Sequence, residues 1–335
     1  MAETFSDLGK VEAIDQLYRL SAYHPVNGLS YLSPKGGRVS TSTRLYQEGI
    51  HFNLVYFPLK HLGYKCVVGV VGELYAALAH PKLLNVVQGI SAKLDFPQVK
   101  ELWMGITVAA KEHGFEAVNL DLQPSENGLF LALSATGETS LLTDKRRMAA
   151  GSKDLICVSG SLGAAYLGLQ VLERGAKSFL SNGEQPDMAQ YRMLVGSYLR
   201  PELPSRVVSQ MEDVEIYPSY GYFVTHGLSD ALKRLHRDSG LGVKVYADKI
   251  PFEGNSFALG KELDLDPVSA AMNGGDDNRL LFVVPILHLE KFRREFQTFD
   301  IIGHLARPEV GTVLVTPEGV ELPVKAQGWP EEEPE

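Results

Sequence analysis

Two glycine-rich segments carry the groups best suited to hold a small ligand. Segment 273–277 (Asn-Gly-Gly-Asp-Asp) places two adjacent carboxylates on a turn beside an apolar stretch, where they can hold Mg²⁺ or a polar substrate. It is equally typical of a solvated turn whose aspartates cap their own backbone. Segment 160–163 (Gly-Ser-Leu-Gly) lies between an expected strand and an expected helix, where backbone N–H groups can bind phosphate. By itself, this second segment is more typical of a tight strand-to-helix turn.

The motifs of several common enzyme classes do not occur in this sequence. There is no Gly-x-x-x-x-Gly-Lys-Ser/Thr motif, which excludes a P-loop nucleotide site. The nine histidines show no His-Glu-x-x-His spacing, and two cysteines cannot build a zinc site. A Gly-x-Ser-x-Gly nucleophile motif is also absent. Zinc enzymes and ordinary serine hydrolases are therefore excluded.

Composition narrows the class of protein further. The 335 residues carry a net charge of −9, and the single short basic cluster, 145–147, does not suit nucleic acid. The longest apolar stretches, 66–71 and 280–286, are far shorter than the roughly 20 residues that cross a bilayer, and the N-terminus has no apolar signal-peptide core. Two cysteines favour a reducing compartment. We expect a cytoplasmic protein that binds neither nucleic acid nor membrane.

Strands and helices alternate in both halves of the sequence, which predicts two α/β domains. Segment 151–153 is the natural boundary, so we expect an N-terminal domain over 1–150, a C-terminal α/β domain over 151–330 and a disordered acidic tail over 331–335. Expected helices are 8–20, 59–71, 98–112, 164–173 and 228–237. Expected strands or extended segments are 39–44, 53–57, 86–90, 117–122, 129–136, 155–159, 216–225, 243–246, 280–285, 301–305 and 312–315.

Three segments match, in order, patterns found together in one enzyme family. Residues 157–173 (CVSGSLGAAYLGLQVLE) are similar to the start of its second domain. Residues 271–285 (AMNGGDDNRLLFVVP) correspond to its A-L-N-G-G-E-D-Y-E-L-L-F-T-V-P pattern, and residues 48–52 (EGIHF) to its E-G-V-H-F segment. Shorter matches extend the resemblance over nearly the whole chain. The sequence resembles the thiamine-monophosphate kinases.

The resemblance implies a fold and a reaction. The fold is the two-domain α/β (α+β) fold of the aminoimidazole-ribonucleotide synthetase superfamily, in which the N-terminal domains of a homodimer form a shared barrel. The reaction transfers the γ-phosphoryl group of ATP to thiamine monophosphate, giving thiamine diphosphate. Because such transfer depends on positioning and charge neutralisation, a carboxylate-bound Mg²⁺ cluster is expected to dominate the site.

Most of the acids that bind metal in the family are replaced here. The family motif T-T-D corresponds to Ser42, Thr43 and Arg44, so a guanidinium stands in place of a carboxylate. In the motif D-I-S-D-G-L, which corresponds to residues 223–228, His226 replaces an acid, and residues 26–31, which correspond to G-D-D-A-A-V, contain none. Only two acids remain. Mg²⁺ requires hard oxygen ligands, so two carboxylates are too few for the multi-metal cluster.

The resemblance assigns a role to nine positions. Each residue also has an ordinary structural explanation: Trp329 as packing for the last strand, Arg147 as part of a solvated basic turn, and His51 as a hydrogen-bonded core residue. The expected roles are catalysis and metal binding for Glu73 and Asp121, nucleotide binding for Ser42, Thr43, Arg147 and Thr225, and thiamine binding for His51, Asp276 and Trp329.

Two functions compete on these grounds. The first is a thiamine-monophosphate kinase, with ATP and Mg²⁺, whose activity is impaired by the lost metal ligands. The second is a non-catalytic paralogue that binds a nucleotide or a phosphorylated small molecule. A phosphotransferase with another acceptor would fit only if its chemistry used one Mg²⁺.

Overall fold

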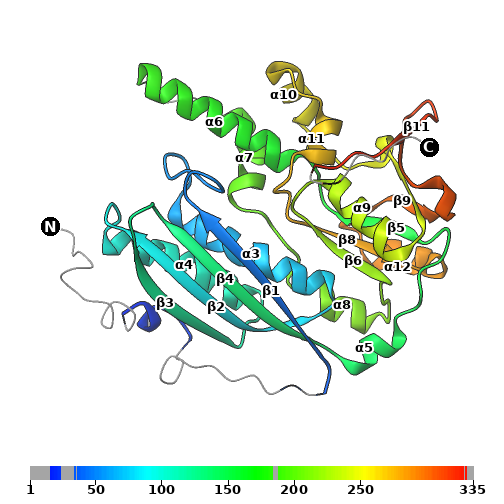
Figure 1. Cartoon of the computed structure of the whole chain (residues 1–335), viewed down its shortest axis with the longest axis horizontal. Helices are drawn as coiled ribbons and strands as arrows, with labels where there is room; N and C mark the ends of the chain where they lie inside the picture. Colours follow the sequence, from blue (N-terminus) through cyan, green and yellow to red (C-terminus); the bar gives the residue numbers. More distant parts are fainter. Residues whose placement is uncertain (1–15, 24–33, 35, 184–187, 328, 330–335) are drawn as a thin grey trace. The chain divides into compact units, whose positions relative to one another are not determined.

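The computed structural model describes residues 16–23, 34, 36–183, 188–327 and 329, which form two compact units (Figure 1). The first unit comprises Met1–Asp144 with Glu202–Val208, and the second comprises Lys145–Pro201 with Ser209–Glu335. The chain therefore leaves the first unit six residues before the boundary predicted at 150, and a later segment returns to it. Both units combine helices with a sheet, which confirms the expected mixed α/β fold class.

The first unit is built on a four-stranded sheet in the order β1-β4-β2-β3. Strands β2 and β3 are parallel, and β4 is antiparallel to both β1 and β2. Its elements are β1 (Arg38–Gln47), α3 (Leu59–Ala76), β2 (His80–Ser91), α4 (Phe96–Glu112), β3 (Ala117–Ser125) and β4 (Phe130–Thr139); helix α5 (Leu141–Arg146) crosses the boundary between the units.

Alternation along the strands divides this sheet into a covered face and an open face. In β4, Leu131, Leu133 and Ala135 are buried, whereas Ala132 and Ser134 between them are partly exposed. Helices α3 and α4 lie together on one side of the sheet (Figure 1). Within the described residues, the opposite face has no covering layer.

Glycines allow α3 and α4 to pack closely. A Cβ atom added at Gly63 would lie 2.2 Å from the carbonyl oxygen of Leu102, and one added at Gly105 would lie 2.0 Å from that of Lys60. The glycine inside the expected helix 59–71 therefore marks a helix–helix contact.

In the first unit, the strand expected at 53–57 is wrong, and the helix expected at 8–20 lies partly outside the described residues. Residues 53–57 form a turn rather than a strand, because the Asn53 side chain accepts the Val55 N–H at 3.0 Å and the Asn53 carbonyl accepts the Phe57 N–H at 3.0 Å. This local capping competes with extended structure. Of the expected helix 8–20, only residues 16–20 are described, and they are helical over 16–19. Residues 26–31 and the tail 331–335 lie outside the described residues.

The second unit is built on a seven-stranded sheet in the order β11-β10-β7-β9-β5-β8-β6. Its core includes Ile156 from β5, Leu232 from α9 and Leu281 from β8. Its strands are β5 (Leu155–Ser159), β6 (Tyr220–Val224), β7 (Gly242–Tyr246), β8 (Arg279–Val284), β9 (Phe299–Ala306), β10 (Thr312–Val315) and β11 (Glu321–Pro323). Its helices are α6 (Ala164–Asn182), α7 (Arg192–Leu199), α9 (Leu228–Ser239), α10 (Ser256–Leu263), α11 (Pro267–Asn273) and α12 (Leu289–Glu295), while α8 (Val207–Asp213) crosses the boundary.

None of the helices in the described residues is long and apolar enough to span a bilayer.

Candidate functional site

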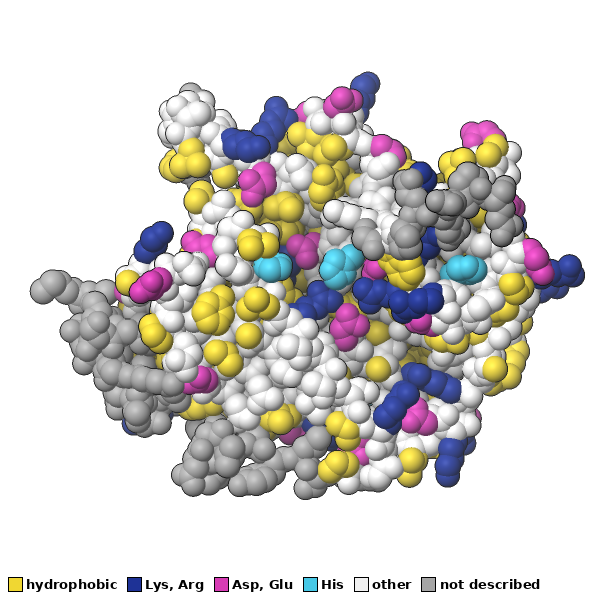
Figure 2. All heavy atoms as spheres, in the orientation of Figure 1, with side chains coloured by type: hydrophobic (Ala, Val, Ile, Leu, Met, Phe, Trp, Pro, Cys, Tyr) yellow, Lys and Arg dark blue, Asp and Glu magenta, His cyan; other side chains and the backbone are white. Residues whose placement is uncertain are grey.

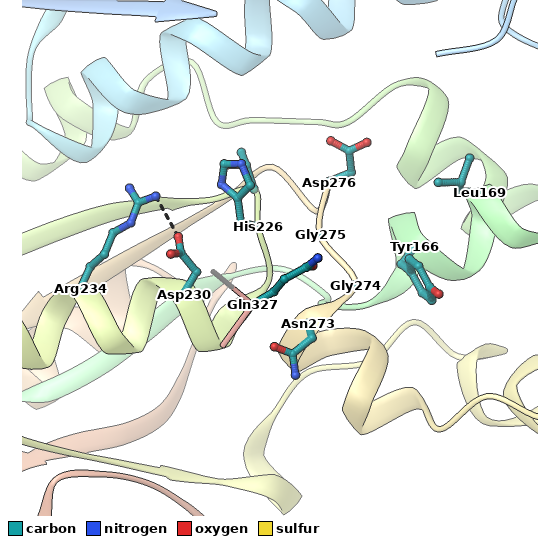
Figure 3. A pocket seen from close by; sticks show the side chains of 11 residues that line it. Tyr166, Leu169, His226, Asp230, Arg234, Asn273, Gly274, Gly275, Asp276 and Gln327 are labelled. Carbon is teal, nitrogen blue, oxygen red and sulfur yellow. Dashed lines mark hydrogen bonds and ion pairs between the residues drawn. The ribbon is translucent and has the colours of Figure 1, made fainter. Parts of the chain in front are cut away.

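A pocket of about 490 Å³ lies wholly within the second unit. It is formed where the N-terminal turns of α6 and α9 meet the C-terminal end of α11 and the turn that follows it (Figure 3). The lining residues are Tyr166, Leu169, Thr225, His226, Asp230, Arg234, Asn273, Gly274, Gly275, Asp276 and Gln327.

Close backbone approach explains why the pocket wall needs glycine. Gly163 has a positive φ of 76°, and a Cβ there would lie 2.8 Å from the backbone nitrogen of Ala271. Gly275 also has a positive φ, 83°, and the N–H of the next residue, Asp276, donates to the carbonyl of Thr225 at 2.8 Å. Because L-residues with side chains rarely adopt these conformations, the two glycine-rich segments hold the pocket wall in place.

The two adjacent aspartates have different environments. Asp276 lines the pocket, whereas Asp277 is only 3% exposed and accepts the backbone N–H groups of Gly163, at 2.9 Å, and Ala165, at 3.3 Å. Burial raises the pKa of Asp277 to about 7, against the opposing effect of these N–H donors and of Arg279. Asp277 thus caps α6 from within the protein.

This cap decides between the interpretations of segment 160–163. The N–H groups of Gly163 and Ala165 at the start of α6 are bonded to the Asp277 carboxylate. The segment is a tight strand-to-helix turn, as the ordinary interpretation predicted, and not a phosphate cradle. Nor do the aspartates of segment 273–277 act as a pair toward one cation.

Asp230 connects helix α9 to the C-terminal segment at the pocket wall. One carboxylate oxygen accepts the Trp329 indole N–H at 2.9 Å, and the other pairs with the Arg234 guanidinium at 2.9 Å (Figure 3). The guanidinium of Arg237 lies 5.4 Å from the centre of the Trp329 ring, within the range of a cation–π contact. The C-terminal segment that contributes Gln327 to the pocket is therefore fixed to α9.

The remaining lining groups suit a polar organic ligand with a flat part. His226 and Asp276 reach the pocket from two neighbouring loops, and Tyr166 from α6 lies on the side opposite α9 (Figure 3). The Thr225 hydroxyl lies 3.2 Å from Nδ1 of His226. Together they offer a carboxylate, an imidazole, a hydroxyl and an aromatic ring. This mixture of apolar walls with a few converging polar groups is typical of small-molecule sites.

Three of the nine positions expected in the site come together here. Thr225 and Asp276 line the pocket, and Trp329 is bonded to its wall through Asp230. Arg147 lies in the same unit, partly buried, but does not line the pocket.

The first unit does not bring its expected site residues together. Ser42 is buried and Thr43 exposed, because successive residues of β1 point to opposite faces of the sheet. His51 is exposed, and its Nδ1 accepts the Gln47 N–H at 3.0 Å.

The two expected metal ligands lie on opposite faces of that sheet. Glu73, on α3, pairs with Arg44 at 3.0 Å. Asp121 lies on β3 between Leu120 and buried Leu122, which places it on the open face, where it accepts the side-chain amide of Gln123. Within one chain, Glu73 and Asp121 therefore do not converge on a common metal ion. In the described part of the chain, no three His, Cys, Asp or Glu side chains are grouped to hold one.

Several pocket residues were not anticipated from the sequence. Asp230 and Arg234 form an i,i+4 pair on the strongly amphipathic α9, a spacing that is readable in advance. Tyr166 and Gln327 carry no comparable signal, because only the fold brings them beside segment 273–277.

Comparisons with known proteins find similarity to two kinds of protein, thiamine-monophosphate kinases and hydrogenase maturation proteins. No family model matches the chain. It is 23% identical over 291 residues to a thiamine-monophosphate kinase of Aquifex aeolicus, covering 86% of each chain. It is 24% identical over 283 residues to a putative hydrogenase expression/formation protein of Methanocaldococcus jannaschii, covering 81% of this chain and 78% of that one.

Solved structures share the fold over almost the whole chain. Thiamine-monophosphate kinase from Stenotrophomonas maltophilia has a TM-score of 0.74 at 21% identity, covering 90% of this chain and 95% of its own. AaThiL complexed with AMPPCP and TMP has a TM-score of 0.70 at 20% identity, covering 95% and 96%. Hydrogenase maturation protein HypE has a TM-score of 0.71 at 20% identity, covering 96% and 98%.

The chain is a two-unit α/β protein with the aminoimidazole-ribonucleotide synthetase-like fold. Among proteins with that fold, its sequence is similar to the thiamine-monophosphate kinases, in agreement with the resemblance of its motifs.

Proposed function

We propose that the chain is a thiamine-monophosphate kinase-like protein that binds thiamine monophosphate and ATP, with phosphoryl transfer much slower than in its relatives. The observation that supports the ligand class is the meeting of Thr225, Asp276 and Trp329 around one pocket. In this proposal Asp276 and Trp329 contact the thiamine moiety. The residues proposed to contact the nucleotide are Thr225, Arg147, Ser42 and Thr43.

The proposed reaction would join a phosphate oxygen of thiamine monophosphate to the γ-phosphorus of ATP, while the bond to the bridging oxygen breaks and ADP leaves. Its barrier is lowered chiefly by charge neutralisation. The residues present do not fit an Mg²⁺ cluster, because Arg44 neutralises Glu73 and Asp121 lies across the sheet. We therefore assign no step of the reaction to a metal ion. Without that charge neutralisation, we expect phosphoryl transfer to be slow.

A second candidate is a non-catalytic paralogue that binds a nucleotide or a phosphorylated small molecule in the same pocket. The Arg44–Glu73 ion pair favours this candidate, since it uses one of the two remaining family acids for a contact within the protein.

The proposed partner is a second copy of the chain. Strands β1–β4 expose a face with few charged side chains (Figure 2), on which Leu45 is 51% exposed. Pairing of two such faces would form the shared barrel expected from the family. We place the protein in the cytoplasm, because its two cysteines are buried and too few for a disulfide scaffold.

Calorimetric titration with thiamine monophosphate and with ATP, each with and without MgCl₂, tests the function, with thiamine as the control that lacks phosphate. We expect thiamine monophosphate to bind without MgCl₂ and thiamine to bind more weakly. Turnover to thiamine diphosphate would establish the kinase, and binding without turnover the paralogue. If neither ligand binds, the proposal fails.

A further inference from the structure

A half-buried ion pair joins strand β1 to helix α3 in the first unit. The Arg44 guanidinium lies 3.0 Å from a Glu73 carboxylate oxygen, and the two side chains are 21% and 35% exposed. The helix passes close to the strand at this level, because a Cβ at Gly69 would lie 3.5 Å from Cδ of Arg44 and 1.7 Å from the Tyr46 hydroxyl oxygen.

The half-buried carboxylate of Glu73 needs a neighbouring positive charge. A carboxylate that loses much of its hydration needs a counter-charge or hydrogen-bond donors. Arg44 supplies both, and its guanidinium stays protonated at every accessible pH. An incoming divalent cation would meet a site that is already neutral and that carries a fixed positive charge.

In the described part of the chain, the other expected metal ligand does not join Glu73 at this level. Asp121 is on the opposite face of the sheet, bonded to Gln123. Residues 24–33 contain no Asp or Glu, and the described residues hold no group of three metal-ligating side chains.

We propose that the Arg44–Glu73 pair is a converted cation site, in which a permanent guanidinium takes the place of a divalent ion and fastens β1 to α3. The fold of the first unit then needs no divalent metal. A carboxylate at position 44 would recreate the requirement for a cation, because two acids would face each other across the same contact. This inference concerns the protein without ligand, so it stands or falls separately from the proposed function.

Thermal unfolding of the full chain in EDTA, MgCl₂ and MnCl₂, with NaCl of matched ionic strength, provides the test. The wild-type midpoint should not respond to either metal. Arg44→Asp should unfold at a lower temperature in EDTA and regain about 5 °C in saturating MnCl₂, because a ligand that binds only the folded state stabilises it.

Two matched variants isolate the new carboxylate pair. Arg44→Met removes the guanidinium without adding an acid, and Arg44→Asp combined with Glu73→Gln keeps a single acid; neither should respond to MnCl₂. A wild-type midpoint that rises with MnCl₂, and loses that rise in Glu73→Gln, would overturn the proposal. So would a folded Arg44→Asp that ignores both metals.

If Arg44→Asp folds only in MnCl₂, the proposal is supported. If it does not fold in any buffer, direct titration of the wild type with Mn²⁺ decides: binding that Glu73→Gln abolishes overturns the proposal, and no binding supports it.

Discussion

Asp230 determines much of the chemistry of the pocket although it was not among the residues expected there. Its carboxylate joins Arg234 on its own helix to Trp329 in the C-terminal segment. Because both of its oxygens are engaged, Asp230 orders the wall, while Asp276 supplies a second carboxylate to the pocket lining. A residue in the first turn of α9 thus holds in place a segment that lies about a hundred residues later in the chain.

Replacing Trp329 with alanine should weaken binding of thiamine monophosphate about fivefold, since an aromatic contact of this kind contributes on the order of 1 kcal/mol. Calorimetry on the full chain measures the change. Phe257→Ala removes an exposed aromatic side chain of the same unit that lies outside the pocket, and should leave the affinity unaltered. Equal affinities for the wild type and Trp329→Ala would restrict Trp329 to a packing role.

Asp277 should make stability fall as pH rises. Its pKa is about 7 in the fold and about 4 in the unfolded chain, so the folded state binds the extra proton between these values. The free energy of unfolding therefore decreases from pH 4 to pH 7, by up to about 4 kcal/mol. Burial lowers the pKa of His113 to about 4, which gives the opposite slope.

The quantity to measure is consequently the difference between the wild type and Asp277→Asn in urea unfolding across pH 4–8. In Asp277→Asn, the free energy of unfolding should no longer show the decrease with pH that Asp277 causes. It should keep the increase with pH that His113 causes. Parallel pH profiles for the two proteins would show that Asp277 is ionised throughout this range.

At the level of elements, the contact between α3 and α4 depends on the absence of side chains at two positions. Gly105→Ala would place a methyl group 2.0 Å from the Lys60 carbonyl oxygen and should destabilise the protein by about 1–3 kcal/mol. Gly196→Ala, in helix α7 with nothing within 4 Å, should instead stabilise it by up to about 1 kcal/mol. Equilibrium unfolding in urea checks both, and equal effects would contradict the close approach.

Elements whose pattern is local were predictable from the sequence. Strands 155–159 and 312–315 match β5 and β10 residue for residue, because short β-branched stretches between turns have few alternatives. The strand predicted at 53–57 was wrong, because the hydrogen bond of the Asn53 side chain, rather than the apolar pattern, determines the backbone conformation there. In the site, motif order identified Thr225 and Asp276. It could not identify Tyr166 or Gln327, whose position depends on contacts distant in sequence.

At the scale of the whole molecule, self-association should depend on the open face of β1–β4. Leu45→Glu introduces a charge on the open face, on the edge strand β1, and should convert a dimer to monomers, because an unpaired charge is costly to bury in an interface. Light scattering after gel filtration gives the mass. Leu180→Glu, at an exposed leucine of α6 in the other unit, should leave the mass as in the wild type. A wild-type monomer, or a dimeric Leu45→Glu, would refute pairing through this face.

The cap on α6 also has a consequence for the order in which the second unit forms. Its donor Gly163 and its acceptor Asp277 are separated by 114 positions, so the chain must close a long loop before the bond exists, and contacts of this kind slow folding. The first turn of α6 and the pocket wall must therefore form at the same stage of folding, after β8 has paired with β5. During refolding, amide protons at Gly163 and Ala165 would gain protection from exchange late, at the same time as the ability to bind ligand.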